Sequence, residues 1–386
     1  MKKVACFLFV FLIFFSTRAL SLNDSSKINK GIWVSVFSKE KVLFSQGAVK
    51  ELVNFAQKNG IDEIYLQMYQ SGKAFYDTKF TDRAKYEEML KSAGADPIDI
   101  LLKEASLKNI KVFAWINVLG IGQNKSAPIV KKFGDSILTR DQYLKTSGGL
   151  RNQDLDKYHI RDEHFFLEPG DPRVGDYTLL IVDEIITRYP LLKGFHLDYV
   201  RYPMTVPFIP SSKFNKFGLD YGFGQRNITR FKEKNGIDPL KDLKTEQKFA
   251  LWDNWKRQQI TDFVRKISKY IKKKSPGMLV SCAVIASPER AYTTLYQDWP
   301  LWLEKSFIDY VILMNYSKDN QLIKEISKSA IALREKGKVY VGLGPFLFKN
   351  NSSGFLEQYR ITLATKPDGI AFFSYDDLAD LDLTLP

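Results

Sequence analysis

The sequence contains very little cysteine. It has two cysteines, Cys6 and Cys282, and Cys6 lies in an N-terminal segment that we expect to be removed. The remaining chain therefore cannot form an intramolecular disulfide. Its stability must come from its hydrophobic core, for which about 365 residues are ample. Cys282 lies in an apolar run, and we interpret it as a small core residue.

Histidine is also scarce, and its spacing gives little support to a metal site. The three histidines are His159, His164 and His196. His159 and His164 are five positions apart in a segment expected to be a loop, which is a weak pattern for zinc. We expect no cofactor, and a metal-dependent deacetylase is the third hypothesis for this chain.

Long apolar runs are absent except at the N-terminus. Lys2 and Lys3 precede an apolar run over residues 4–15, and small residues occupy positions 19 and 21. This pattern predicts a secretory signal peptide over residues 1–21, followed by a flexible segment over 22–30. A membrane anchor is the alternative, but the run is shorter than the about 20 residues that span a bilayer. We expect an exported protein, periplasmic or extracellular, with no stable membrane insertion.

Positive charge exceeds negative charge. The chain has 57 Lys and Arg against 44 Asp and Glu, a formal net charge of +13. Removing residues 1–21, with Lys2, Lys3, Arg18 and no acid, leaves +10. This balance favours anionic surfaces such as acidic glycans and cell-wall polymers. No dense basic block is present, so we do not expect a nucleic-acid partner. The sequence does not predict the oligomeric state.

Apolar runs alternate with amphipathic segments along the rest of the chain. The expected strands cover residues 31–37, 62–69, 110–118, 194–199, 278–285, 308–316, 338–345 and 369–375. The expected helices cover residues 46–58, 97–108, 172–188, 245–274, 295–305, 320–336 and 353–364. Eight buried strands separated by helices predict an α/β fold, a (β/α)8 TIM-type barrel. There is no room for a full eighth helix after Tyr375, so that helix is expected to be reduced or missing.

Two connections are too long to be plain turns. They cover residues 119–171 and 201–244, after the third and fourth expected strands. Long insertions at the carboxyl ends of barrel strands usually form a substrate cleft. Since we find neither an interdomain linker nor a repeat beyond the βα alternation, residues 31–386 are predicted to form a single catalytic-type barrel.

The sharpest local signal is the segment 194–203, with the sequence GFHLDYVRYP. An apolar strand ends there in the carboxylate of Asp198, followed by Tyr199 and Arg201. In a barrel this strand end opens into the cleft, so the carboxylate is a candidate catalytic group. The alternative is a structural ion pair between Asp198 and Arg201.

Polar and aromatic residues recur at the other strand ends, a mixture suited to sugar rings and their hydroxyl groups. The candidate substrate-binding residues are Trp33, Gln67, Tyr69, Trp115, Asn117, His196, Tyr199, Arg201, Asn315, Tyr316, Tyr375 and Asp376. Glycoside hydrolysis needs a second carboxyl group across the scissile bond. Glu168 is our first candidate, because Pro169 and Gly170 fix its backbone, and Glu289 and Asp376 follow.

These motifs together resemble the glycosyl-hydrolase-like family 10 proteins. The resemblance extends over about residues 31–378, through segments 31–33, 66–67, 114–117, 167–170, 194–198, 340–342 and 369–378. It implies an exported bacterial barrel in a family that includes an enzyme acting on peptide-stripped peptidoglycan glycans. The family pattern has Asp where this chain has Glu168, which keeps the acid but lengthens its reach.

Two other barrel families share parts of the pattern. Chitinases carry an acid where this chain has Val200, and an aspartate where it has Ser317, so substrate-assisted chitinase chemistry is not expected. The alpha-amylase superfamily has a similar strand whose aspartate is the nucleophile, an analogy at the level of fold that suits Asp198. We predict a glycoside hydrolase acting on a polysaccharide, with a catalytically silent glycan-binding barrel as the alternative. An enzyme should hold two carboxyl groups about 5–10 Å apart in its cleft.

Overall fold

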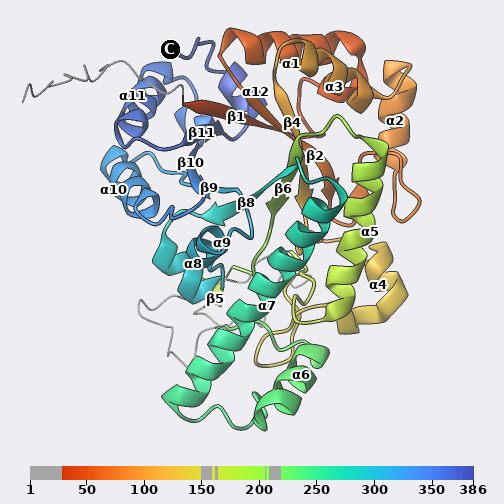
Figure 1. Cartoon of the computed structure of the whole chain (residues 1–386), viewed down its shortest axis with the longest axis vertical. Helices are drawn as coiled ribbons and strands as arrows, with labels where there is room; N and C mark the ends of the chain where they lie inside the picture. The colour runs from red at the N-terminus through yellow and green to blue at the C-terminus, as the bar shows by residue number, and fades with distance from the viewer. Residues whose placement is uncertain (1–27, 149–158, 161–163, 205, 208–218) are drawn as a thin grey trace, which may run out of the picture.

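The chain folds into a closed barrel of parallel strands. In the computed structural model, which describes residues 28–148, 159–160, 164–204, 206–207 and 219–386, the strands are ordered β1-β11-β10-β9-β8-β6-β4-β2 (Figure 1). β1 also pairs with β2, which closes the sheet. The barrel strands are Asn29–Val34 (β1), Glu63–Gln70 (β2), Lys111–Asn117 (β4), Gly194–Asp198 (β6), Leu279–Ile285 (β8), Tyr310–Met314 (β9), Lys338–Leu343 (β10) and Gly369–Phe372 (β11). The predicted (β/α)8 barrel is confirmed, while the predicted signal peptide lies outside the described residues.

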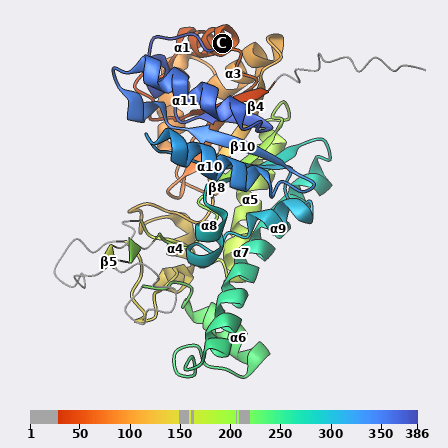
Figure 2. The ribbon, with the colours of Figure 1, turned by 90° about the vertical axis from the view of Figure 1, so that its left-hand side faces the viewer.

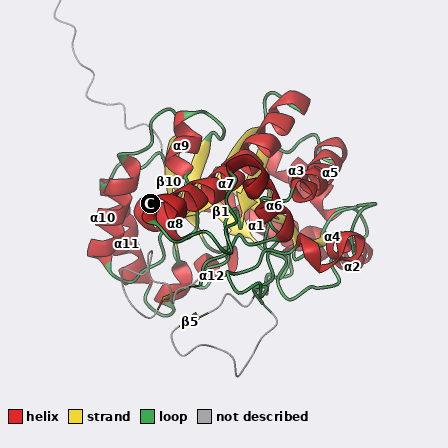
Figure 3. Ribbon diagram, turned by 90° about the horizontal axis from the view of Figure 1, so that it is seen from below, coloured by secondary structure: helices red, strands yellow, loops and turns green. Residues whose placement is uncertain are grey.

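Helices surround the barrel because each strand is followed by an amphipathic segment that packs on its outer face (Figure 3). Their starts follow the expected capping chemistry, since Asp96 and Asp171 each accept backbone hydrogen bonds ahead of a proline at the first helical position. No helix among the described residues combines the length and apolar character needed to cross a membrane. The main outer helices are Gln46–Lys58 (α1), Pro97–Leu107 (α3), Pro172–Arg188 (α5), Glu246–Lys274 (α7), Pro288–Thr294 (α8), Trp299–Glu304 (α9), Asn320–Ile331 (α10) and Ser352–Ala364 (α11).

The eighth helix is reduced to the short α12, Tyr375–Ala379. Ser374 and Asp377 form a capping box at its start, which ends β11 at Phe372. The prediction that the last strand continues to Tyr375 is therefore wrong at its end. Tyr375 instead points toward α1 and packs edge-on against Phe55, with ring centroids 5.2 Å apart.

The carboxyl ends of the strands carry the long insertions. Residues after β4 form α4, Pro128–Phe133, and the 3-10 helix η2, Gly134–Ile137, while α6, Gln225–Asn235, belongs to the insertion after β6. The short strands His159–Ile160 (β5) and Val206–Pro207 (β7) pair with each other across the two insertions. α7 extends from the barrel wall past the strand ends to α6, so one helix supports both parts (Figures 1 and 2).

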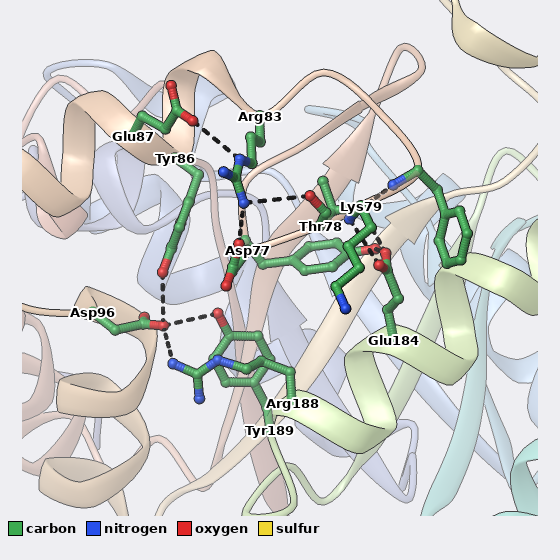
Figure 4. A network of polar contacts seen from close by, with 12 residues as sticks. Asp77, Thr78, Lys79, Arg83, Tyr86, Glu87, Asp96, Glu184, Arg188 and Tyr189 are labelled. Atoms are coloured by element: carbon green, nitrogen blue, oxygen red, sulfur yellow. Dashed lines mark hydrogen bonds and ion pairs between the residues drawn. The ribbon is translucent and has the colours of Figure 1, made fainter.

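A third insertion, between β2 and α3, was not predicted. It contains the short strand Lys73–Ala74 (β3) and α2, Ala84–Ala93. A polar network fastens it to α5 (Figure 4): Glu184 accepts hydrogen bonds from Thr78 Oγ1 at 2.5 Å and from the Lys79 backbone N–H at 2.8 Å. The carboxylate of Asp96 accepts from Arg188 at 2.7 Å. Carboxylates thus tie the insertion to α5, in addition to the buried side chains of Phe75, Tyr76 and Met89 that pack into the core.

The floor of the barrel interior is polar. Glu63, the first residue of β2, is 1% exposed and accepts hydrogen bonds from the hydroxyls of Tyr65 at 2.7 Å and Tyr310 at 3.2 Å. The ammonium of Lys111 lies 3.7 Å from the same carboxylate. Burial raises the pKa of Glu63, and these neighbours oppose the shift. Above this floor the interior is filled mainly by aromatic rings, which leaves the opposite, carboxyl end for a site.

Candidate active site

Strand register brings four polar side chains to the inner rim at the carboxyl ends of neighbouring strands. Alternate residues of a barrel strand point inward, and the pairing places Gln67 beside Trp115 and Asn117 beside Asp198. Ser35, which follows β1, donates a hydrogen bond to Gln67 Oε1 at 2.8 Å. The predicted residues Gln67, Trp115, Asn117 and Asp198 therefore lie on one continuous arc of the rim.

Asp198 is the carboxylate of this arc. Trp115 Nε1 donates to Asp198 Oδ2 at 3.1 Å, and the backbone N–H of Tyr199 donates to Oδ1 at 2.6 Å. Burial raises the pKa of Asp198, while these two hydrogen bonds and the positive charge of Arg201 act in the opposite direction. Both oxygens accept from N–H groups, which cannot themselves act as acceptors, so the two contacts suit the ionised carboxylate.

An aromatic wall stands beside Asp198, centred on Phe373, the residue after β11. Its ring centroid lies 5.8 Å from that of Trp33, 6.2 Å from that of Trp115 and 5.9 Å from that of Tyr316. Phe346, in the turn after β10, packs edge-on against Tyr316 at 5.6 Å. Burial raises the pKa of Tyr316 and the charge of Asp198 raises it further, so this hydroxyl lies within electrostatic range of the carboxylate.

Phe346 and Phe373 were not among the predicted site residues. The inward alternation of β11, in which Ala371 lies in the interior cluster, could have identified Phe373 two residues later. Phe346 follows Pro345 in a 3-10 turn, Pro345–Phe348, which has no alternation to read. Aromatic side chains of this kind are suited to packing against the C–H face of a sugar ring.

His196 lies one layer below Asp198 on the same strand and is fully buried. Its Nδ1 is 2.9 Å from Ser281 Oγ, and its ring packs against those of Trp33 and Tyr65, with centroids 5.4 and 4.8 Å away. Its Nε2, like Asn117 Oδ1, has no hydrogen-bond partner among the described residues. Burial lowers the pKa of His196 to about 3, so the imidazole is neutral and cannot serve as a cation near pH 7.

Tyr199 and Arg201 line the start of the insertion after β6. Tyr199 adopts a left-handed backbone conformation with φ 56°, and its ring packs so closely on Gly120 that a Cβ at position 120 would lie 2.5 Å from it. The Arg201 guanidinium stacks over the rings of Tyr199 and Phe166, at 5.0 and 5.2 Å, and donates to the Tyr202 carbonyl. Arg201 thus contributes its charge to Asp198 while its side chain is held by aromatic rings.

Four predicted binding residues lie away from this arc. Tyr69 is buried in the layer between barrel and helices, where Tyr177 of α5 is its neighbour. Asn315 donates to the Ile323 carbonyl of α10 at 3.2 Å. Tyr375 packs on α1, as described above, and the Asp376 carboxylate accepts hydrogen bonds from Ser38 Oγ and the Lys39 backbone N–H. These side chains join elements of the fold.

Glu168, the first candidate for the second carboxylate, is fully buried among the insertions. It accepts four hydrogen bonds, at 2.8 to 3.1 Å, from Thr139 Oγ1, Tyr202 Oη and the backbone N–H groups of Gly170 and Gly224. Burial raises its pKa, and these four donors oppose the shift. Gly224 is required by this contact, because a Cβ there would lie 2.7 Å from Glu168 Oε2.

Glu289 has the opposite environment. It is the second residue of α8, directly after the carboxyl end of β8, and its side chain is exposed. β8 is the neighbour of β6, the strand that carries Asp198. Among the described residues its carboxylate makes no hydrogen bond or ion pair, so of the three candidates it is the one free to meet a ligand. Within the same part of the chain, no group of three or more His, Cys, Asp or Glu side chains is arranged to hold a metal ion.

The chain is similar in sequence to two bacterial proteins named as glycosyl hydrolases. It is 22% identical over 319 residues to glycosyl hydrolase DigH of Escherichia coli K12, covering 75% of this chain and 65% of that protein. It is 20% identical over 281 residues to glycosyl hydrolase YngK of Bacillus subtilis, covering 68% of this chain and 47% of that protein. The chain therefore spans less than two thirds of either relative.

Solved barrels share the fold at low sequence identity. The catalytic domain of beta-amylase from Paenibacillus polymyxa superposes with a TM-score of 0.57 at 12% identity, covering 93% of this chain and 95% of that one. A beta-galactosidase from Bacillus circulans sp. alkalophilus gives 0.58 at 12% identity, covering 90% of this chain and 50% of that one. The family model described as glycosyl hydrolase-like 10 matches residues 28–343. The solved structures show the fold that this chain shares, and the family model shows that the chain belongs to the glycosyl hydrolase-like 10 family.

Proposed function

We propose that this protein is a glycoside hydrolase that cleaves a polysaccharide at the carboxyl end of the barrel, with Asp198 as the anionic carboxylate. The observation that carries the proposal is the position of Asp198 at the end of β6, beside Trp115, Tyr316 and the aromatic wall around Phe373. Membership of a glycosyl hydrolase-like family supports the same chemistry. The substrate class we favour is an amino-sugar glycan of the cell wall.

In this proposal Asp198 acts on the anomeric carbon, either by direct attack or by activating a water molecule. Its two N–H contacts favour the ionised form against the effect of burial and fix the direction of the carboxylate, which suits a nucleophile or a base. A second carboxyl group must give a proton to the leaving oxygen. The geometry changes our ranking: Glu289 precedes Glu168, because Glu168 has its oxygens occupied by four donors.

The Asp198→Asn variant is the direct test. We expect it to fold, to retain glycan binding, and to lose nearly all hydrolysis on a panel of purified glycans that includes bare peptidoglycan strands. New reducing ends and retention on a glycan affinity gel are measured for the same samples. Near wild-type turnover in the variant would exclude the role of Asp198, whereas an unfolded variant would favour a structural pairing with Arg201.

The proton donor is identified by Gln variants of Glu289, Glu168 and Asp376. A substrate with an activated leaving group needs no proton, so it restores the rate of the variant that lacks the general acid and of no other. We expect this rescue for Glu289→Gln. Full activity of Glu289→Gln on the natural glycan would remove Glu289 from the mechanism.

A catalytically silent glycan-binding barrel is the second candidate function. It is favoured by one observation: of the four candidate acids, Asp198 alone lies on the arc of the rim beside the aromatic wall, while Glu168 and Asp376 are engaged in hydrogen bonds within the fold. Such a protein would be retained on the affinity gel and would release no reducing ends from any glycan of the panel.

We also propose that the protein is exported. The motivation is the charged and apolar pattern of residues 1–21 described above. N-terminal sequencing of protein recovered from the producing cells tests it, and the expected first residue follows position 21. A mature protein that keeps Met1 and residues 4–15 would show that this segment is an anchor or is not processed.

A further inference from the structure

An arginine-lined pocket that shares no residue with the arc of the rim or the aromatic wall lies where the starts of α5 and α6 meet η2. Its volume is about 470 Å³. Three of its eight lining residues are arginines, and five come from α6 alone. The lining residues are Ser136, Pro172, Arg173, Gln225, Arg226, Thr229, Arg230 and Glu233.

Two of the three guanidinium groups are held in place. Arg173 forms two-pronged hydrogen bonds with Asp171, at 2.5 to 3.1 Å, and stacks over Phe133 at 4.8 Å. Arg230 Nη1 donates to the Gly170 carbonyl at 2.5 Å and to Gln259 at 2.8 Å. A fixed guanidinium loses little conformational entropy when it binds a ligand, so these side chains are preorganised.

The third arginine, Arg226, makes fewer contacts with the protein than the other two. It is 57% exposed, and its nearest acid is Asp171, at 3.8 Å from its Nε. Among the described residues its guanidinium makes no hydrogen bond. The carboxylate of Asp171 is already engaged by Arg173, so the full five-donor fork of Arg226 remains available to an external acceptor.

The charges around the pocket do not cancel. Three arginines face Glu233 on the lining and Asp171 behind it, which leaves one excess positive charge. The first turn of α6 adds to this potential, because its cap residue Gly224 has no side chain to accept from the free N–H groups. The helix end reinforces the potential that the arginines create.

We propose that this pocket binds an oxyanion, a carboxylate or a phosphate group, through Arg226 and Arg230. Guanidinium groups bind such ligands through paired, charge-assisted hydrogen bonds. The oxyanion is either a free small ion or a substituent of an acidic glycan. The second case rests on the proposed function and makes the pocket an accessory site for an acidic wall polymer.

Titration calorimetry on the full chain tests the pocket with three probes: inorganic phosphate, an oligogalacturonate and a neutral chito-oligosaccharide. The test variant is Arg226→Gln. The matched control is Arg265→Gln, because Arg265 on α7 is 56% exposed and lies outside the pocket. We expect phosphate affinity to fall about tenfold in Arg226→Gln, the loss of one charged hydrogen bond, and to stay unchanged in the control.

The probes also separate the sources of the oxyanion. Loss of both phosphate and oligogalacturonate binding in Arg226→Gln supports a polymer-borne group, and loss of phosphate binding alone supports a free ion. If the wild type does not bind phosphate, or if the wild type and Arg226→Gln bind it equally well, the proposed oxyanion site is refuted. Hydrolysis of a neutral glycan should be unaffected by Arg226→Gln. A chain that hydrolyses nothing but binds phosphate through Arg226 would refute the enzyme and leave the pocket intact.

Discussion

At the scale of single residues, Glu168 shows a buried carboxylate that joins separate loops. Its four donors come from the insertion after β4, from its own turn and from the insertion after β6. Carboxylates with several donors can be functional or structural, and the sequence around Glu168, with its rigid Pro169 and Gly170, is compatible with both. The complete use of its oxygens favours the structural role, and the catalytic role stays a prediction.

We expect Glu168→Gln to be strongly destabilised. The Gly170 N–H donates to Oε1 and the Gly224 N–H to Oε2, so an amide, which keeps one oxygen, would place its NH2 group against one of these two buried donors. The cost should be about 3 kcal/mol in the free energy of unfolding, measured by urea denaturation. Glu289→Gln is the control and should change this free energy by less than about 0.5 kcal/mol, since its side chain is exposed. Equal free energies of unfolding for the two variants would contradict the structural role of Glu168.

His196 predicts a pH dependence of stability. Burial lowers its pKa in the folded protein to about 3, below the ordinary 6.5, so the folded state resists taking up the proton. Its stabilising effect is complete above pH 6.5 and is lost as the pH falls from 6.5 toward 3, by about 1.4 kcal/mol per pH unit.

The variant His196→Asn should flatten this slope, because it lacks the titrating ring while keeping a polar atom near Ser281. The measurement is the free energy of unfolding from urea titrations between pH 7 and pH 4.5. Ser353→Ala, which removes no titratable group, is the control and should keep the wild-type slope. An unchanged slope in His196→Asn would assign the acid sensitivity to other groups.

At the scale of elements, the five-residue helix α12 takes the place of a full eighth helix after the last barrel strand. Ser374 and Asp377 satisfy the N–H groups of its first turn, and Asp376 binds the loop after β1. Ser374→Ala should cost about 1 kcal/mol of stability, as for other helix caps. The melting temperature of this variant is compared with that of the control Ser353→Ala, a serine inside α11. Equal melting temperatures of the two variants would mean that the cap at Ser374 contributes nothing to stability.

The strands and outer helices could be predicted because each obeys a local rule. Buried parallel strands are continuous apolar runs, and α3 and α5 begin with Asp followed by Pro. The insertion with α2 could not be predicted in the same way, because its buried apolar residues follow no regular spacing and polar contacts distant in sequence complete its attachment to α5. α6 carries few apolar residues and is likewise fixed by contacts distant in sequence.

The positions of the candidate site residues could be predicted from the sequence where strand alternation determines the direction of a side chain. Gln67, Trp115, Asn117 and Asp198 lie on one rim because they occupy inward positions of paired strands. Beyond the strand ends this alternation no longer predicts where a side chain points. Tyr375 points outward because the chain enters α12 there, and Asn315 donates a hydrogen bond to α10. Which acid faces the ligand depends on loop contacts that no local pattern records.

At the scale of the whole molecule, the excess positive charge predicts the response of binding to salt. The formal net charge is +13 over the whole chain. Binding to an anionic wall polymer should weaken as salt rises, because counterions screen exposed lysines and arginines, while binding to a neutral oligosaccharide should change little. The prediction is tested by measuring the affinity for each of the two ligands at about 0.05 and 0.5 M salt. Equal responses of the two ligands would mean that the charge serves solubility alone.

The closure of the barrel by β1 and β11 has a consequence for synthesis. Asn29, the first residue of β1, pairs with Gly369, the first residue of β11, so β1 gains its second neighbour only after β11 has left the ribosome. Until then two sheet edges offer unpaired backbone groups to other nascent chains. Chains that stop before residue 369 should therefore aggregate, and a chaperone that shields strand edges would act on this protein late in its translation.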